Sequence, residues 1–178
     1  MSKTFSYFAY GSNLLAKRLR LNNPSAVRNG IGKLEDYEID FASFSPRWRG
    51  AIATITPKEG RVVWGSIWEL DIEHLKTLDD QEGVHRGLYF GTDVDVVTED
   101  GSRKRCRIYK LAHKARFVKN IEELPEERRP SPAYLKVILL GAKESNLPEN
   151  YVEFLRRIPH NGYSGDIGID LDVLEKGS

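Results

Sequence analysis

The sequence predicts an α+β fold, in which a small mixed and mostly antiparallel β-barrel is flanked by helices. About six β-rich runs follow one another before residue 112, with few helical segments between them. Such an order of elements favours antiparallel pairing and closure into a barrel over a doubly wound parallel sheet. The length of 178 residues, of which 40% are hydrophobic, predicts a single domain over residues 1–178 with a sizeable core.

The first predicted strand begins at Thr4 and leads into a glycine turn at Gly11. After the turn, Ser12 and Asn13 are good N-cap residues, and residues 14–19 have the pattern of an amphipathic helix. A strand, a turn and a helix start leave backbone N–H groups without partners, which form a cradle for a carboxylate or another small anion. The alternative is an ordinary strand-to-helix connection.

The strands expected next cover residues 34–44, 51–56, 61–70, 88–98 and 103–112. The first of these shows the alternation of a half-buried strand, and the second and third are separated by a turn at Pro57–Gly60. The last two form a hairpin across Glu99–Ser102.

The C-terminal third begins with a charged insert at about residues 113–130, which is either a weak helical face of Phe117, Ile121 and Leu124 or a surface excursion. A helix then opens at the Ser131 cap, with Pro132 in its first turn. A further helix is expected over residues 148–158, and a docked, extended tail is indicated by the alternation of Ile167, Ile169, Leu171 and Val173.

A short helix predicted over residues 71–83 carries an acid in an unusual place. Its buried face is marked by Ile72, Leu75 and Leu78. Asp79 and Asp80 fall outside this face and are expected in solvent, but Glu82 lies on it, beside a glycine cap. Burial and the negative end of the helix dipole both raise the pKa of a carboxyl group, so Glu82 is a candidate general base. The competing interpretation is a surface glutamate paired with Arg86.

Composition argues against several classes of function. A net charge of +1 implies neither a nucleic-acid partner nor an anionic membrane surface. No apolar run approaches the roughly 20 residues that cross a bilayer, and the N-terminus lacks the apolar region of a signal peptide. The lone Cys106 fits a reducing compartment, and we expect a cytoplasmic protein. Cys106 shares a strand face with Ile108 and is expected to be buried and inert, and the four histidines show no metal-ligand spacing.

Five segments stand in the order of a known family: YFAYGSNL at 7–14, WRGAIAT at 48–54, DQEGV at 80–84, PSPAY at 130–134 and GAKE at 141–144. Together they resemble the γ-glutamylcyclotransferase family, and ordered motifs are more specific than any one alone. The resemblance implies a small mixed β-barrel that releases 5-oxoproline and a free amino acid from γ-glutamyl amino acids or dipeptides, with neither metal nor cofactor. It further implies a homodimer and a place in the γ-glutamyl cycle of glutathione metabolism.

Site residues follow from the same resemblance. The family's catalytic glutamate matches Glu82, and the substrate site is implied to be lined by Tyr7, Phe8, Ala9, Tyr10, Gly11, Ser12, Tyr89, Tyr109 and Tyr134. The charged insert is longer than expected for the family, so the resemblance does not predict whether a lid covers the pocket.

The implied reaction closes a five-membered ring when the substrate's own α-amine attacks its γ-carbonyl. An ammonium cannot attack, and a glutamate of pKa about 4.3 facing an α-amine near 8 is mismatched by roughly 5 kcal/mol. Burial of Glu82 reduces that mismatch. The Gly11 and Ser12 amides would hold either the α-carboxylate or the developing oxyanion. Alternatives are a related cyclotransferase acting on γ-glutamylamines or glutathione, and a non-catalytic binding module on the same fold.

Overall fold

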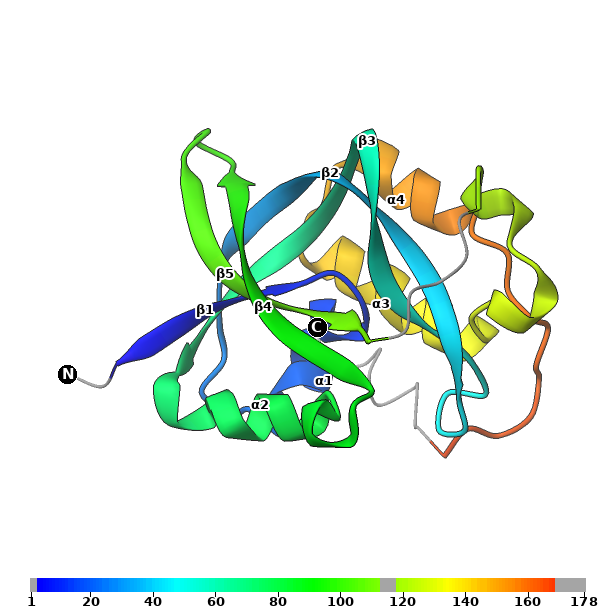
Figure 1. Ribbon diagram of the computed structural model, residues 1–178, viewed down its shortest axis with the longest axis horizontal. Coiled ribbons are helices and arrows are strands. Elements are labelled where there is room, and N and C mark those ends of the chain that lie inside the picture. The colour runs from blue at the N-terminus through cyan, green and yellow to red at the C-terminus, as the bar shows by residue number, and fades with distance from the viewer. Residues whose placement is uncertain (1–2, 113–117, 169–178) are drawn as a thin grey trace.

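Five strands of the computed structural model form a closed barrel (Figure 1), and the structure describes residues 3–112 and 118–168. The strands are β1 Thr4–Ala9, β2 Val27–Ser45, β3 Gly50–Asp71, β4 Tyr89–Thr98 and β5 Arg103–Leu111. The α-helices are α1 Ala16–Arg20, α2 Leu75–Gln81, α3 Pro132–Glu144 and α4 Glu149–Arg156. In the described part of the chain, no helix combines the length and the apolar character that a bilayer crossing requires.

The barrel closes in the order β1-β3-β2-β4-β5. Neighbours pair antiparallel, except that β1 meets β5 in parallel, with Tyr7 opposite Arg107. The prediction of a mixed, mostly antiparallel barrel flanked by helices is confirmed. Figure 1 shows α2 along the lower edge of the barrel, while α3 and α4 pack together on its right.

One long strand, β3, replaces two predicted strands. Residues 51–56 and 61–70 both pair with β2, although a turn at Pro57–Gly60 was expected to separate them. Most of that turn instead bulges out of the ladder opposite Asp36, whose carboxylate accepts the N–H of Gly60 at 2.9 Å. The turn residues were recognised correctly, but a bulge interrupts a strand without ending it. The barrel therefore has five strands rather than about six.

The segment after Gly11 is less helical than predicted. Where one helix was expected over residues 14–19, the chain makes a 3₁₀ turn at Ser12–Leu14, an extended residue at Leu15 and then the short α1. Neither Ser12 nor Asn13 caps a helix with its side chain, because the Asn13 amide bonds side chains of other elements.

Helix α3 holds this turn in place. A Cβ atom at Gly141 would lie 2.6 Å from both Leu14 Cβ and Leu15 N, so only glycine permits the contact. The predicted cap is confirmed, since the Ser131 hydroxyl accepts the N–H of Tyr134 at 3.2 Å. The predicted second helix is present as α4.

Helix α2 has the predicted glycine cap but a narrower buried face. Gly83 takes the left-handed conformation with φ of 70°, and Leu78 is fully buried. Ile72 is wrong as a core residue, because it precedes the α-helix in a 3₁₀ turn and is 46% exposed.

Asp79 is not a solvated residue, contrary to prediction. Its carboxylate accepts hydrogen bonds from the Tyr109 hydroxyl and, at 2.9 Å, from the Arg107 guanidinium, both on β5. Asp80 is exposed as predicted and pairs with Lys76 one turn away. Asp79 thereby fastens α2 to the barrel.

The charged insert is described from residue 118 onward. It forms two 3₁₀ turns, Ile121–Glu123 and Glu126–Arg128, and buries Ile121 and Leu124, so this part packs on the barrel. Phe117 lies outside the described residues, as do Ile169, Leu171 and Val173 of the predicted tail. Ile167 is partly buried against the core.

Candidate active site

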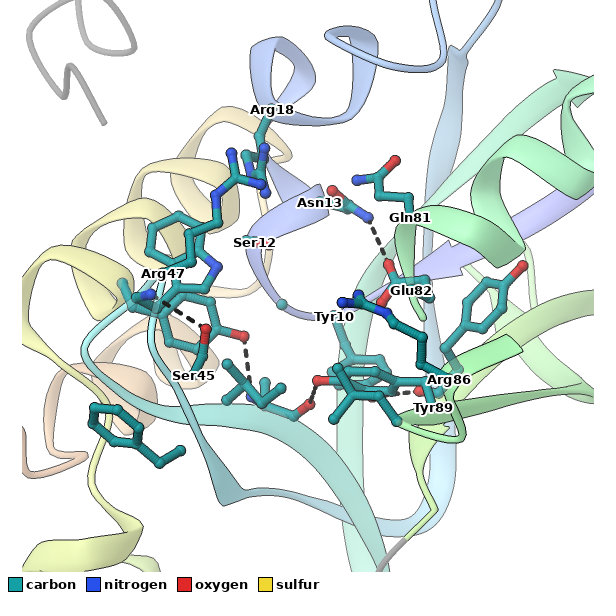
Figure 2. A pocket seen from close by; sticks show the side chains of 18 of the residues that line it. Tyr10, Ser12, Asn13, Arg18, Ser45, Arg47, Gln81, Glu82, Arg86 and Tyr89 are labelled. Carbon is teal, nitrogen blue, oxygen red and sulfur yellow. Dashed lines mark hydrogen bonds between the residues drawn. The ribbon is translucent and has the colours of Figure 1, made fainter. Parts of the chain in front are cut away.

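A cavity of about 590 Å³ opens where the turn after β1, the loop between β2 and β3, and the end of α2 meet (Figure 2). Residues from β4, β5 and α3 complete its wall. It brings together eight of the ten predicted site residues, namely Tyr7, Tyr10, Gly11, Ser12, Glu82, Tyr89, Tyr109 and Tyr134.

Phe8 and Ala9 do not line this cavity. Both side chains are buried in the hydrophobic core. Successive side chains of a strand point to opposite faces, so a continuous run of residues in β1 cannot face one cavity. The two residues support the site from behind.

The hydroxyls of three pocket tyrosines are tied to backbone groups. Tyr89 donates to the Ala53 carbonyl at 2.6 Å, Tyr134 accepts the Ala53 N–H at 3.0 Å, and Tyr10 donates to the Tyr109 carbonyl at 2.5 Å. Burial raises the pKa of each of these tyrosines above its ordinary value. They are therefore neutral groups that shape the cavity and leave acid–base work to another residue.

Glu82 supplies the titratable carboxyl group of the cavity. Burial raises its pKa to about 7, and the Arg18 charge and a hydrogen bond from Asn13 oppose that rise. The Asn13 Nδ2 atom lies 3.1 Å from Glu82 Oε1 and 3.1 Å from the Tyr7 hydroxyl oxygen. A carboxyl group of pKa near 7 is suited to exchange protons at neutral pH.

The turn after β1 presents three backbone amides. The N–H groups of Leu14 and Leu15 return to the carbonyls of Gly11 and Ser12 at 3.1 and 3.3 Å. Among the described residues, the N–H groups of Gly11, Ser12 and Asn13 have no such acceptor. The turn thus offers the unpaired N–H groups that an anion cradle requires, and the Asn13 side chain of the same turn reaches the carboxyl group of Glu82.

Several pocket residues were missed by the sequence reasoning, chiefly Asn13, Arg18, Arg47 and Arg86. Arg18 gave no signal because it belongs to a basic run in a short helix. Trp48 opens the WRGAIAT motif but was not predicted to line the site. Its buried ring lies 4.8 Å from the Tyr134 ring, between centroids, and it lines the cavity.

Cys106 is buried, as predicted, and burial raises the pKa of its thiol to about 12. An inert thiol follows. Within residues 3–112 and 118–168, no group of three or more His, Cys, Asp and Glu side chains is arranged to hold a metal ion.

Comparison with known proteins places this chain in a family. The model of the AIG2-like family matches residues 62–155. A γ-glutamylcyclotransferase of Mus musculus is 43% identical and one of Homo sapiens 41% identical, each alignment spanning 98% of this chain and 90% of the relative. A solved structure named γ-glutamyl cyclotransferase superposes with a TM-score of 0.88 at 38% identity, covering 98% of this chain and 100% of the other.

Proposed function

The chain belongs to the AIG2-like family and is a γ-glutamylcyclotransferase, and we propose that it converts γ-glutamyl amino acids and dipeptides to 5-oxoproline and a free amino acid with Glu82 as general base. The observation that carries this mechanism is the carboxyl group of Glu82, with a pKa of about 7. It is the one carboxyl group among the described residues that line the cavity.

The raised pKa matters because the reaction begins with the loss of a proton from the substrate ammonium. An α-amine has a pKa near 8, so a base of pKa near 7 leaves a mismatch of about 1 unit, or roughly 1.4 kcal/mol. A glutamate of ordinary pKa would leave roughly 5 kcal/mol. Burial therefore removes much of the barrier to forming the free amine.

The bonds and protons of the proposed step balance without water. The substrate α-nitrogen forms a bond to the γ-carbonyl carbon, and the bond from that carbon to the leaving nitrogen breaks. Glu82 takes one proton from the ammonium before the attack and delivers it to the leaving nitrogen. The second proton that the α-nitrogen loses as the lactam forms passes to the departing amine, which leaves as an ammonium, so Glu82 ends the cycle in its starting state. Because nucleophile and target are tethered, the pocket has to select one substrate conformer.

The turn amides are proposed to hold the α-carboxylate of the γ-glutamyl group. This carboxylate and the reacting amine are attached to the same carbon, so both lie close to Glu82 during proton transfer. The cradle of Gly11, Ser12 and Asn13 is next to Glu82, because Asn13 belongs to both. The side-chain amide of Asn13 donates to the base, and its backbone N–H is one of the three without an acceptor.

Mass spectrometry of two matched substrates tests the reaction type. A γ-glutamyl dipeptide with a free α-amine should give 5-oxoproline and no glutamate, while its N-acetyl derivative should be inert. Release of glutamate or N-acetylglutamate at comparable rates would mean hydrolysis by water and would refute the proposal. Water lacks the effective molarity of about 10⁵ M or more that a tethered amine has.

Three further properties are proposed from the family resemblance. We propose a homodimer, supported by the exposed apolar side chains of Leu21 and Val27. A cytoplasmic location is supported by the reduced, buried Cys106. A role in glutathione metabolism would follow from the substrate class.

A further inference from the structure

Arg18 is a buried cation that makes no ion pair with another described residue, although it feels the charge of Glu82. Its side chain is 7% exposed, and its guanidinium lies over the Trp48 ring, 5.4 Å from the centroid. Its Nε atom is buried with no hydrogen-bond partner, and no ion pair joins Arg18 to another described residue. By contrast, Arg28 and Arg128 each meet a carboxylate at 2.6 Å.

This arrangement is costly unless a ligand completes it. Burial and the nearby charge of Arg47 lower the pKa of Arg18, and the opposing charge of Glu82 offsets these effects only in part. Leaving a buried charge unpaired is costly, and stacking on an aromatic ring recovers only part of that cost. Because Arg18 lines the cavity, an anionic group bound there would satisfy it.

The charge of the whole cavity fits a ligand with two carboxylates. Its described lining includes three arginines, Arg18, Arg47 and Arg86, against one carboxyl group, that of Glu82. A γ-glutamyl amino acid carries two carboxylates and one ammonium group. A γ-glutamylamine lacks the second carboxylate, which the leaving amino acid would supply. The cavity therefore has cations in excess of those that the γ-glutamyl group alone needs.

Geometry separates the two carboxylates. Figure 2 shows Arg18 and Arg47 on the side of the cavity away from Glu82. In this view Ser12 lies between the two arginines and Glu82. The reacting amine must lie at Glu82, so the α-carboxylate on the same carbon falls to the turn amides. The carboxylate of the leaving amino acid is several bonds away, beyond the γ-carbonyl, and can extend toward Arg18.

We propose that Arg18, with Arg47 at the rim, binds the carboxylate of the leaving amino acid and makes the enzyme prefer γ-glutamyl amino acids over γ-glutamylamines. The assignment deepens the proposed function and rests on Glu82 marking the position of the amine. Arg18 is then a specificity residue for the leaving group. It contacts the substrate without taking part in the proton transfer.

Kinetics with γ-glutamyl-alanine and γ-glutamyl-ethylamine, which differ only in that carboxylate, test this assignment. Arg18→Met keeps the stem over Trp48 but removes the charge. Its kcat/KM should fall by about 100-fold more for the alanine substrate than for the ethylamine substrate, which is the scale of a lost charge-assisted hydrogen-bond pair. Arg18→Lys should recover part of the preference, because it restores the charge without the planar fork.

A surface arginine supplies the control. Arg105 is exposed and pairs with Asp95 on the barrel exterior, so Arg105→Met should leave both rates and their ratio unchanged. Equal losses on the two substrates in Arg18→Met would overturn the proposal and place Arg18 on the γ-glutamyl group. An unchanged ratio with unchanged rates would also overturn it.

Calorimetry separates this proposal from the reaction mechanism. In a Glu82→Gln background, which is not expected to turn over, γ-glutamyl-alanine should bind more tightly than γ-glutamyl-ethylamine. Adding Arg18→Met should abolish that difference while leaving the affinity for 5-oxoproline, which has no leaving group, intact. Retained 5-oxoproline binding also shows that the variant is folded. If the parent makes no 5-oxoproline, the mechanism fails, but the affinity difference still decides the role of Arg18.

Discussion

The Nδ2 atom of Asn13 lies 3.1 Å from the Oε1 atom of Glu82, which joins the turn after β1 to the end of α2. Two whole strands, β2 and β3, lie between the two residues in the chain, and the bond fixes the base relative to the anion cradle. The donor also stabilises the charged form of the carboxyl group and limits how far burial raises its pKa.

Removal of that donor should therefore move the pH profile. Asn13→Ala leaves the carboxylate without its hydrogen bond, so the pKa of Glu82 should rise further, by about 1 unit. The acidic limb of kcat/KM against pH should shift upward by the same amount. A limb that stays in place would show that the bond does not tune the base.

Replacement of the base itself should nearly abolish turnover. Glu82→Gln keeps the shape and a hydrogen-bond acceptor but cannot take the proton, so kcat should fall by about 10³-fold or more, with 5-oxoproline affinity retained. The exposed neighbour offers a matched control, since Asp80→Asn should retain activity. Turnover within tenfold of the parent would exclude Glu82 as the base.

The same substitution should change how stability depends on pH. Because the pKa of Glu82 in the folded protein is about 7, above the ordinary 4.5, the folded state binds the proton more tightly than the unfolded state does. This contribution to the free energy of unfolding is fully present below pH 4.5 and is lost as the pH rises through 7. Relative to the parent, Glu82→Gln should gain up to about 3 kcal/mol between pH 4.5 and 8 in urea unfolding. A constant difference between the two proteins across this range would contradict the raised pKa.

Asp79 should act as a positioning residue. Asp79→Asn weakens the hold of Arg107 and Tyr109 on α2, so the protein should lose about 1–2 kcal/mol of stability. Glu82 follows at the end of the same helix, and kcat should fall more than KM changes. Asp80→Asn breaks only an exposed pair on that helix and should alter neither quantity much. If the two variants behave equally, Asp79 does not position Glu82.

The cradle can be tested at Gly11. A Cβ atom there would lie 3.4 Å from Ala53 Cβ and 3.7 Å from the Tyr134 hydroxyl, so the additional methyl groups of valine must enter the cavity. Gly11→Val should lose measurable affinity for 5-oxoproline in calorimetry. A folded variant that binds as the parent does would mean that the carboxylate is held elsewhere.

The strand pattern predicted the barrel because alternation and turn residues are local properties of the chain. Strand continuity is not local, which is why residues 51–56 and 61–70 were separated: the common partner β2 decides that they form one strand. Glu82 was found from its helical spacing, although the stripe it lies on borders an open cavity as much as a core.

The polar partners could not be found in this way. Asp79 bonds to Arg107 and Tyr109, which lie about 30 positions away in the sequence. The notable feature of Arg18 is a missing hydrogen-bond partner, which only the folded structure reveals. Periodicity reports which residues face inward but not which polar groups meet there. Such contacts depend on the closed barrel.

Strands β1 and β5 pair in parallel, with Tyr7 opposite Arg107. The pocket can therefore form only after the chain has been synthesised as far as β5. The first strand leaves the ribosome early but has no partner on that side until the fifth has been made. Tyr109 is made with β5, and Tyr134 of α3 follows later still, so a nascent chain that has already paired β2 with β3 holds no complete cavity. Pairings between distant segments form slowly because loop closure must come first. The active site is consequently completed late in folding. Recovery of activity after denaturation therefore reports closure of the barrel rather than formation of the long β2–β3 hairpin.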